Sequence, residues 1–302
     1  MCSVQVSILI VNYKTEELVC ECISSIQTLT QSVSYEIIVI DNNSGDSLDC
    51  IRKAYPEVQV IALPENVGFG AANNIAYQAS QGEVIFFLNP DTILKNNAVF
   101  YLYETLMSNP NIGVCGANLY TSDHKANVSF LPFPHFKSEV KQLLGLKKEL
   151  EMDAYYNFSG QSKIIDGFIS GADMMVRRDV LQKCGAFDTD FFMYYEDCEL
   201  SFRIKKNGYE IMSVPAAKII HLQGMSCEAK GEEMKLNSFL MLLRSRYLYL
   251  LKTEGKTNAS IWYILYSLKC FTAKTIFAFL NNDKKKHYWK SVAEELKMIK
   301  HG

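Results

Sequence analysis

The amino-acid sequence predicts an α/β protein with a doubly wound, mainly parallel sheet flanked by helices and followed by a helical C-terminal extension. Two observations support this prediction. In residues 6–91, short apolar runs rich in β-branched residues alternate with helical segments, and polar or glycine-rich turns follow the runs. After about residue 231 the sequence is helical and apolar to its end. Alternating strands and helices imply parallel strands joined by right-handed crossovers.

The N-terminal half can be read element by element. Residues 6–11 form a nearly continuous run of Val, Ile and Leu, which is typical of a strand buried on both faces. The other strands expected in this half are residues 35–40, 58–63 and 83–88, and the helices are residues 15–29, 48–55 and 68–80.

The second half of the chain is less regular. Residues 118–165 contain two prolines and several aromatic residues, and we interpret them as an insertion or a lid with a helix near residues 137–151. We expect a main domain at residues 1–230 and a helical region at residues 231–302. Further strands are predicted at residues 168–176, 210–214 and 217–221, and further helices at residues 178–184 and 196–207.

Composition and charge exclude several classes of protein. With 302 residues, of which 48% are hydrophobic and 21% charged, the chain can bury a sizeable core and is neither disordered nor fibrous. The formal net charge of −2 argues against nucleic acid as a partner. The 9 cysteines are scattered and lack the paired spacing of a zinc site. Their odd number and apolar surroundings indicate reduced thiols, as in a cytosolic protein.

Neither a signal peptide nor a membrane-spanning helix is predicted. The apolar run at residues 6–11 is too short for a signal core. Residues 261–280 approach membrane length, but Lys269 and Lys274 favour an amphipathic helix lying in the plane of a surface. The basic and aromatic residues of the helical region suit either an anionic membrane surface or a homodimer interface or cap on the core. We expect a cytoplasmic protein, either free or peripheral on the inner face of the cell membrane.

Four polar loops follow the predicted strands at one edge of the sheet. In doubly wound sheets, ligands bind outside the carboxyl ends of the strands. This rule selects residues 12–13, 41–43, 66–70 and 89–91, all of them rich in polar residues or glycine. The agreement predicts a nucleotide site at this edge.

Acids and glycines in these loops suggest how a nucleotide would be held. Asp91 follows an apolar strand and suits a hard divalent cation that bridges two phosphates, whereas a plain turn made by Pro90 is the alternative. Asp41 suits a hydrogen bond from a base or ribose, or an Asx turn that closes the strand. The glycines in residues 66–74 would let backbone amides approach a phosphate, or they form an ordinary helix start.

An acidic cluster opens the helix predicted at residues 196–207. Glu196, Asp197 and Glu199 follow an aromatic run and fit a pocket with a general base that removes the proton of an attacking hydroxyl. Capping by acids in a first helical turn is the alternative. His221 ends a predicted strand, where it either completes the coordination of a metal at Asp91 or has a structural role.

Eight segments of this sequence occur in a specific order: residues 6–13, 39–44, 66–74, 87–92, 169–172, 187–188, 192–200, and 220–221 with Gly224 and Ser226. In this order they resemble family 2 glycosyltransferases, and more narrowly their rhamnosyltransferase-like branch. The resemblance covers roughly residues 4–250. It implies a GT-A fold in which residues 1–117 form the nucleotide-binding half, residues 118–165 the lid or insertion, and residues 166–230 the acceptor-binding half.

The resemblance also implies roles for individual residues on the donor side. Asp41 would contact a pyrimidine base in a pocket shaped by Asn12 and Asn43. Asn89-Pro90-Asp91 stands where the family carries its DXD-like motif, so Asp91 would bind Mg²⁺ or Mn²⁺ as the main carboxylate ligand. The complete set implied for the nucleotide sugar is Val11, Asn12, Tyr13, Asp41, Asn43, Asn66, Gly70, Asn73, Asn89, Asp91 and Gly171.

On the acceptor side, the resemblance implies inverting transfer by direct displacement. Asp197 would be the catalytic base, Glu196 would orient the acceptor or the base, and His221 would reach the metal or the diphosphate. The branch favours dTDP-L-rhamnose as donor, with a UDP-hexose as the alternative. The acceptor would be a growing polysaccharide or a polyprenyl-diphosphate-linked oligosaccharide in cell-surface glycan synthesis.

Two other functions compete with glycosyl transfer. A nucleotidylyltransferase needs a glycine-rich, basic loop after its first strand, but Asn12-Tyr13-Lys14 follows the first strand here. A non-catalytic glycan-binding homologue would not require both Asp91 and Asp197. The sequence therefore favours the enzyme.

Overall fold

The computed structural model describes residues 4–146, 151–222 and 232–301. The chain forms two compact units, which we call the sheet unit and the helical unit. The sheet unit comprises Met1–Phe133, Leu150–Phe192 and Glu196–Ala229, and the helical unit comprises Pro134–Glu149, Met193–Tyr195 and Lys230–Gly302.

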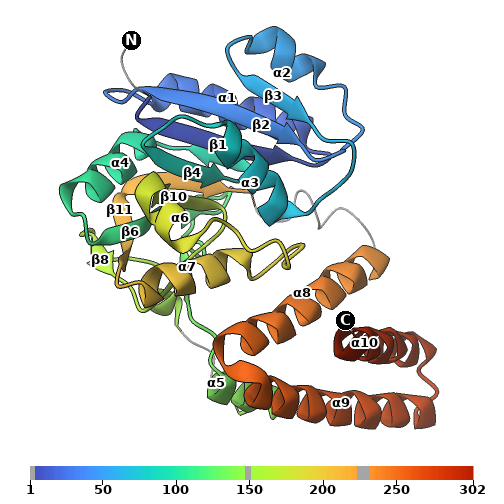
Figure 1. The fold of residues 1–302 in the computed structure, drawn as a ribbon. Helices are drawn as coiled ribbons and strands as arrows, with labels where there is room; N and C mark the ends of the chain where they lie inside the picture. The colour runs from blue at the N-terminus through green and yellow to red at the C-terminus, as the bar shows by residue number, and fades with distance from the viewer. Residues whose placement is uncertain (1–3, 147–150, 223–231, 302) are drawn as a thin grey trace. The chain divides into compact units, whose positions relative to one another are not determined.

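Four parallel strands form the N-terminal half of the central sheet (Figure 1). β1 (Val6–Asn12) lies between β2 (Tyr35–Asp41) and β4 (Val84–Leu88), and β3 (Gln59–Ala62) pairs with the outer edge of β2. All seven residues of β1 are buried, because its run of Val, Ile and Leu packs on both faces of the sheet. The helices of this half are α1 (Glu16–Leu29), α2 (Asp49–Ala54) and α3 (Phe69–Ala79).

The other half of the sheet is mixed. β10 (Asp173–Arg177) runs antiparallel to β4 and to β6 (Ile112–Tyr120), whereas β6 runs parallel to β11 (Glu210–His221). β5 (Thr92–Leu94) and β8 (Lys163–Ile164) pair antiparallel with β11. The remaining elements of the unit are α4 (Ala98–Ser108), α6 (Arg178–Cys184), α7 (Glu196–Lys206), a short 3₁₀ helix (Met152–Ala154), and the two-stranded sheet of β7 (Phe130–Pro132) and β9 (Gly167–Ile169).

The strand order reverses between β1 and β4. From β1 the chain continues on one side to β2 and β3, and it then returns through α3 to β4 on the other side. Loops that leave two such strands diverge, and ligands bind in the crevice between them. Asn12 ends β1 and Asn89 follows β4 directly, so two of the predicted loops lie at this reversal.

The predicted class, an α/β fold with a mainly parallel sheet and a helical C-terminal part, is confirmed. Two local predictions were wrong. The strand expected at residues 168–176 is divided between β9 and β10, because a loop at residues 170–172 separates them. The two strands expected at residues 210–221 are one strand, β11, whose pairing is irregular between Val214 and Lys218. The sequence patterns also missed β5, α4 and β6.

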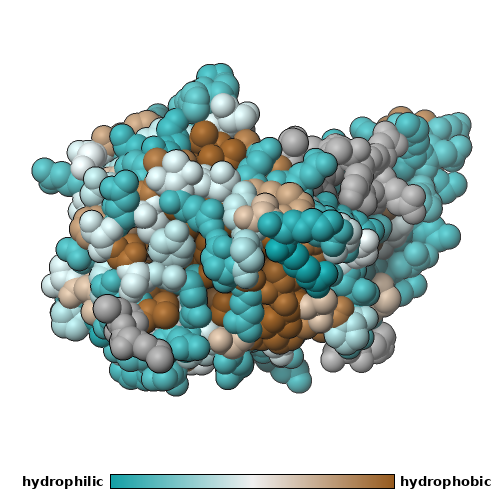
Figure 2. Space-filling view, turned by 90° about the horizontal axis from the view of Figure 1, so that it is seen from above, coloured by the Kyte–Doolittle hydropathy of each residue, from teal (hydrophilic) through white to brown (hydrophobic). Residues whose placement is uncertain are grey.

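The helical unit has its own core. It contains α5 (Phe136–Leu143), α8 (Glu232–Thr253), α9 (Gly255–Phe279) and α10 (Asp283–His301), and Trp262 is fully buried at its centre. The helix predicted at residues 137–151 ends at Leu143 in the structure. Within residues 4–146, 151–222 and 232–301, no helix is long and apolar enough to cross a membrane. In the view of Figure 2, hydrophilic residues make up most of the surface, with smaller apolar areas between them.

Arg246 and Ser245 hold the short segment Met193–Tyr195 within the helical unit. Nε of Arg246 donates to the Tyr195 hydroxyl at 2.8 Å and lies 3.5 Å from Oε2 of Glu139, whose side chain is only 6% exposed. The Ser245 hydroxyl donates to the backbone oxygen of Met193 at 2.7 Å. Tyr194 and Tyr195 both have a positive φ, of 70° and 68°. Such backbone is costly for residues other than glycine and persists only where the surroundings hold it.

The prediction that all the cysteines are reduced was wrong for one pair. Cys20 in α1 and Cys50 in α2 form a disulfide, which ties these two helices together. The other cysteines in the described part of the chain are free, and four of the five are buried. Burial raises the pKa of the Cys22 thiol to about 12, so Cys22 stays protonated and inert.

Candidate active site

Asn12 organises the loops that follow β1 and β2. Its side-chain nitrogen donates to Oδ1 of Asp41 at 2.8 Å and to Oδ2 of Asp46 at 2.9 Å. Its Oδ1 accepts hydrogen bonds from the backbone N–H and the hydroxyl of Thr15, just before α1. Because Asn12 is fully buried, it can act on a ligand only through the residues that it holds, above all Asp41.

The other residues predicted for the base pocket differ in exposure. Tyr13 is 44% exposed, and Asn43 is exposed with a positive φ of 56°, a conformation that asparagine tolerates better than most residues. Val11 and Asp41 are buried at the ends of their strands, both at 6% exposure. Tyr13 and Asn43 are therefore the members of this set that a ligand could touch most freely.

Asn42, which the sequence analysis did not single out, joins two of the predicted loops. Its side-chain nitrogen donates to Oδ1 of Asn66 at 3.0 Å, and its Oδ1 accepts from the backbone N–H of Val67 at 3.0 Å. Oδ1 of Asn66 also accepts from the N–H of Gly68. The side-chain oxygen of Asn66 thus helps to hold this loop in place.

The glycines at the start of α3 are explained by a close protein contact. Gly68 has φ +86°, and a Cβ at this position would lie 2.5 Å from the backbone oxygen of Phe192. A Cβ at Gly70 would lie 3.1 Å from Cβ of Phe187. The N–H of Phe69 donates to that same Phe192 oxygen at 2.9 Å. The space beside these two glycines is filled by Phe192 and Phe187, so close packing within the chain accounts for the absence of a side chain at both positions.

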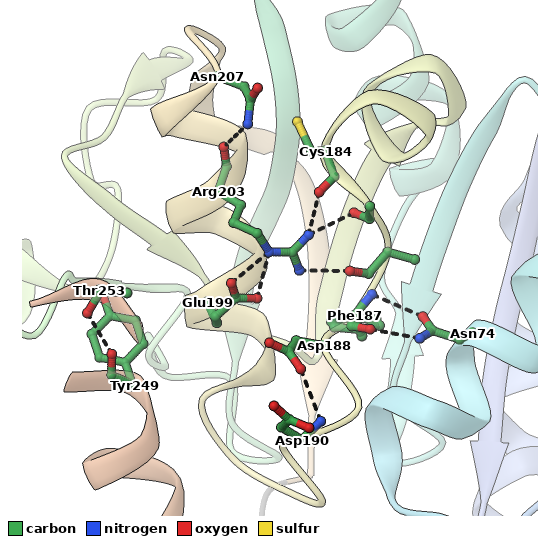
Figure 3. Close-up of polar contacts among 12 residues, drawn as sticks. Asn74, Cys184, Phe187, Asp188, Asp190, Glu199, Arg203, Asn207, Tyr249 and Thr253 are labelled. Carbon is green, nitrogen blue, oxygen red and sulfur yellow. Dashed lines mark hydrogen bonds and ion pairs between the residues drawn. The ribbon is translucent and has the colours of Figure 1, made fainter. Parts of the chain in front are cut away.

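Two neighbouring asparagines of α3 have different partners. Asn73 is buried and donates to the backbone oxygen of Phe69 within the helix, so it stabilises α3 itself. Asn74 donates to the backbone oxygen of Phe187 at 2.8 Å and accepts from its N–H at 3.0 Å (Figure 3). This double hydrogen bond joins α3 to the segment that precedes α7.

Arg203 holds the start of the same segment. Its guanidinium donates to both carboxylate oxygens of Glu199, at 2.6 and 2.8 Å, and to the backbone oxygens of Cys184, Gly185 and Ala186 (Figure 3). Glu199 is only 5% exposed and fully engaged in this pair. Of the three acids that we considered for a general base, Glu199 is therefore structural.

The structure brings the predicted metal residues Asp91 and His221 together. Nε2 of His221 lies 3.3 Å from Oδ1 of Asp91, because β11 pairs with β5 so that His221 faces Thr92. The N–H of Leu222 donates to the backbone oxygen of Asp91 at 2.9 Å. Both side chains are largely buried, and Nδ1 of His221 is buried without a hydrogen-bond partner in the described structure.

A short series of hydrogen bonds connects the Asp91 loop to Asp197. The N–H of Asn89 donates to the backbone oxygen of Ala172 at 2.9 Å. The adjacent N–H of Gly171 donates to Oδ2 of Asp197 at 2.8 Å. Gly171 is closely packed against Asp197, since a Cβ at this position would lie 3.1 Å from that same oxygen. The loop at residues 170–172 thus fixes Asp197 relative to the end of β4.

Glu196 and Asp197 differ in how their carboxyl groups are solvated. Oδ1 of Asp197 accepts from the N–H of Cys198 at 2.7 Å and Oδ2 from Gly171, so this carboxylate has two backbone donors. Oε2 of Glu196 is buried without a partner among the described residues. Burial, together with the neighbouring Asp197, raises the pKa of Glu196 to about 8. Burial also raises the pKa of Asp197, against the effect of its two donors.

Asp173 is a further buried acid, and it was not among the predicted site residues. It is fully buried in β10, where Oδ2 accepts from the N–H of Ala117, and burial raises its pKa well above the usual range. Its position inside the apolar run at residues 168–176 was the feature of the sequence that could have identified it as a buried acid. For Arg203, the signal was its i,i+4 spacing from Glu199. Asn42 and Asn74 gave no comparable signal.

This arrangement defines the class of protein: an α/β enzyme with polar loops at a strand reversal, a buried Asp–His pair and an acidic pair that opens a helix. Residues 7–185 match the model of the family "Glycosyl transferase family 2". Because the match covers more than half of the chain, the chain belongs to glycosyl transferase family 2. The family expected from the sequence is thereby confirmed. Gly224 and Ser226, also used for that resemblance, lie outside the described residues.

Several characterised proteins are similar to the chain over much of its length. Rhamnosyltransferase WbbL of Escherichia coli K12 is 28% identical over 198 residues, which cover 62% of this chain and 72% of that protein. N-acetylglucosaminyl-diphospho-decaprenol L-rhamnosyltransferase of Mycobacterium tuberculosis is 26% identical over 61% of this chain and 66% of its own length. Poly-beta-1,6-N-acetyl-D-glucosamine synthase of Staphylococcus epidermidis is 24% identical over 88% of this chain but 64% of its own length.

A solved structure supports the fold. GalNAc-T7, crystallised with UDP, GalNAc and Mn²⁺, superposes with a TM-score of 0.55 at 16% identity. The superposition covers 81% of this chain and 48% of that one. The chain therefore has the GT-A fold, and it spans about half the length of this neighbour.

Proposed function

We propose that the chain is an inverting glycosyltransferase that transfers L-rhamnose from dTDP-L-rhamnose to a polysaccharide or a polyprenyl-diphosphate-linked oligosaccharide. Membership of the family supports sugar transfer, and the two relatives named as rhamnosyltransferases support the sugar. The observation that carries the proposal is the hydrogen-bonded loop at residues 170–172, which ties the Asp91 loop to Asp197. A donor site and an acid pair held by one rigid loop suit a direct displacement.

The nucleoside end of the donor would bind at the loops after β1 and β2. Asp41 is positioned by Asn12 and would accept a hydrogen bond from the base or the ribose. Tyr13 and Asn43 are exposed next to these strand ends and would contact the base from its open side. Asn66, Gly70 and Asn73 would act by holding the loop and helix in place rather than by direct contact.

The residues at Asp91 fit a divalent cation. Asp91 offers a carboxylate oxygen and His221 a ring nitrogen, 3.3 Å apart as neighbouring ligands of one ion would be. In the described parts of the chain, no cluster of three or more His, Cys, Asp or Glu could hold a metal ion. Mg²⁺ and Mn²⁺ sites of this kind take their other ligands from substrate phosphates and water. When bound, Mg²⁺ or Mn²⁺ would stabilise the negative charge of the leaving nucleoside diphosphate.

Asp197 would act as the general base. The oxygen of the acceptor hydroxyl attacks the anomeric carbon as the bond from that carbon to the diphosphate oxygen breaks. The hydroxyl proton passes to the carboxylate of Asp197. Because the nucleophile enters opposite the leaving group, the configuration of the anomeric carbon is inverted. The two backbone donors orient Asp197 for this step and lower its pKa against the larger effect of burial.

Glu196 would carry a proton when Asp197 is charged. Its pKa of about 8 keeps it neutral near neutral pH, because two adjacent buried carboxylates are not easily ionised together. A neutral Glu196 can donate a hydrogen bond to the acceptor. The two carboxyl groups would therefore have different roles: Asp197 accepts the proton and Glu196 orients the acceptor.

Donor assays test this proposal directly. The purified chain is incubated with dTDP-L-rhamnose or UDP-hexoses, with Mg²⁺, with Mn²⁺ or with EDTA, and the release of nucleoside diphosphate is measured. We expect metal-dependent turnover of dTDP-L-rhamnose and stabilisation of the chain against heat by that donor with Mn²⁺. Turnover of a UDP-hexose instead would reassign the donor. Stabilisation without turnover of any donor or acceptor would favour a non-catalytic glycan-binding protein.

A further inference from the structure

Helix α9 exposes a continuous apolar stripe along one face. The opposite face packs against α5, α8 and α10 through the buried residues Ala259, Trp262, Tyr266 and Cys270. The stripe consists of Ile261, Ile264, Leu268 and Phe271, which are 41%, 56%, 57% and 69% exposed. Their spacing of three, four and three residues places them on one side of a helix. Phe279 and Leu280 extend the apolar surface at the helix end, with exposures of 88% and 62%.

The charges on α9 all have one sign. The helix contains Lys256, Lys269 and Lys274 and no acidic residue, and all three lysines are exposed. At 3.6 residues per turn, Lys269 and Lys274 lie on opposite flanks of the stripe, about 110° from its middle. Shortly after the helix, Lys284–Lys286 are also exposed.

The apolar stripe together with the lysines favours an anionic membrane as the binding partner of α9. An apolar stripe flanked by lysines is typical of a helix that lies in the interface of an anionic membrane, where the lysine amines reach the headgroups. A second copy of α9 packed on the stripe would bring only further lysines and no acid to pair with them. Anionic phospholipid complements both the apolar and the charged parts of the surface.

We propose that α9 binds the headgroup region of an anionic phospholipid membrane, with Ile261, Ile264, Leu268 and Phe271 inserted and Lys269 and Lys274 at the lipid phosphates. This proposal rests on the proposed function for its biological role: a polyprenyl-linked acceptor is itself held in a membrane, so membrane binding would bring the enzyme to its acceptor. Binding to lipid requires neither donor nor acceptor, however. It can therefore succeed or fail independently of sugar transfer.

Vesicle flotation with the full chain tests the proposal. Vesicles of phosphatidylcholine alone are compared with vesicles of equal parts phosphatidylcholine and phosphatidylglycerol, without substrates. We expect binding to the mixed vesicles that weakens at high salt. Leu268→Glu/Phe271→Glu should abolish binding. The control Phe158→Glu/Ile164→Glu makes the same change at side chains that are 63% and 56% exposed on the sheet unit, and it should bind like the natural chain.

The lysines provide a second test. Lys269→Gln/Lys274→Gln should lower the affinity for the mixed vesicles by about fivefold per lysine, and leave the weak binding to neutral vesicles unchanged. Circular dichroism should show that every variant keeps its helix content. Equal binding of the two glutamate double variants would overturn the proposal, as would equal affinity for both kinds of vesicle. So would a dimer in the absence of vesicles that Leu268→Glu/Phe271→Glu converts to monomer, since the stripe would then cover a second copy.

Discussion

Oδ1 of Asp91 lies 3.3 Å from Nε2 of His221, although the two residues are far apart in the sequence. The pairing of β5 with β11 creates this proximity, and neither loop alone would hold it. Both side chains are largely buried, so the pair is positioned before any ligand arrives.

Loss of His221 should weaken the binding of the metal more than the binding of the donor. In His221→Ala, the concentration of Mn²⁺ needed for half-maximal turnover should rise about tenfold or more, because one of two protein ligands is gone. Asp91→Asn should have a larger effect. The measurement is a metal titration at saturating donor. Equal Mn²⁺ dependence in His221→Ala and the natural chain would remove His221 from the site.

Asp197→Asn should abolish transfer and preserve donor binding. An asparagine keeps the size of the side chain and cannot take up a proton, so kcat should fall by about 10²–10⁴-fold. The donor Kd, measured by calorimetry, should change little. Glu199→Gln is the contrast, since Glu199 pairs with Arg203 and should affect stability more than chemistry. Near-normal turnover by Asp197→Asn would show that Asp197 is not the general base.

Gly171→Ala should disturb Asp197 without touching it chemically. The new Cβ would lie 3.1 Å from Oδ2 and 3.3 Å from Cβ of Asp197, so the carboxylate must move. Small displacements of a catalytic group are costly, and we expect kcat to fall by roughly 10- to 100-fold. The donor KM should stay the same. Thermal unfolding provides the control, and a variant with lower stability but unchanged kcat would contradict the prediction.

Glu196→Gln should alter how stability depends on pH. The pKa of Glu196 is about 8 in the folded chain, against an ordinary value of 4.5. Between these values the folded chain keeps a proton that the unfolded chain has lost, so its stability falls as pH rises. The variant lacks this contribution, and its advantage over the natural chain should grow through this window. Urea unfolding of both proteins at each end of the window measures this difference in stability. Parallel plots of stability against pH for the variant and the natural chain would contradict the prediction.

Arg246→Met should destabilise the helical unit. The substitution leaves the buried carboxylate of Glu139 without its ion pair, a change that costs about 3–5 kcal/mol in buried pairs. The second substitution, Glu139→Gln, should recover part of the loss. Lys290→Met is the matched control, because its pair with Glu294 is exposed and should contribute less than about 1 kcal/mol. Denaturant unfolding followed by circular dichroism compares the stabilities of these variants. Equal losses of stability in Arg246→Met and Lys290→Met would contradict the prediction.

Much of the fold and the outline of the site followed from the sequence. Buried strands such as β1 are recognisable by continuous Val, Ile and Leu, and the rule for strand ends led to Asp41 and Asp91. The acidic start of a predicted helix and the end of a predicted strand pointed to Asp197 and His221, and the ordered motifs then implied a role for each. Whether two side chains meet depends on strand register, which sequence patterns do not specify. The motifs therefore suggested that Asp91 and His221 share a site, but their contact became visible only in the folded chain.

Residues that hold the loops were harder to find. The glycine-rich start of α3 allowed either a phosphate or an ordinary helix start, and in the structure Phe192 and Phe187 pack against Gly68 and Gly70. Both phenylalanines lie far away in the sequence, so no local pattern reveals the contact. Arg203 hydrogen bonds to three backbone oxygens, which are present at every position and leave no trace in the sequence.

The short segment Met193–Tyr195 interleaves the two units along the sequence. It belongs to the helical unit by its contacts, yet it is covalently joined to Phe192 on one side and to Glu196 on the other. Removing the chain after Ala229 would therefore strip this segment of Arg246 and Ser245 and release two tyrosines from their left-handed backbone. A change in the C-terminal helices can thus reach the residues that directly precede the acidic pair.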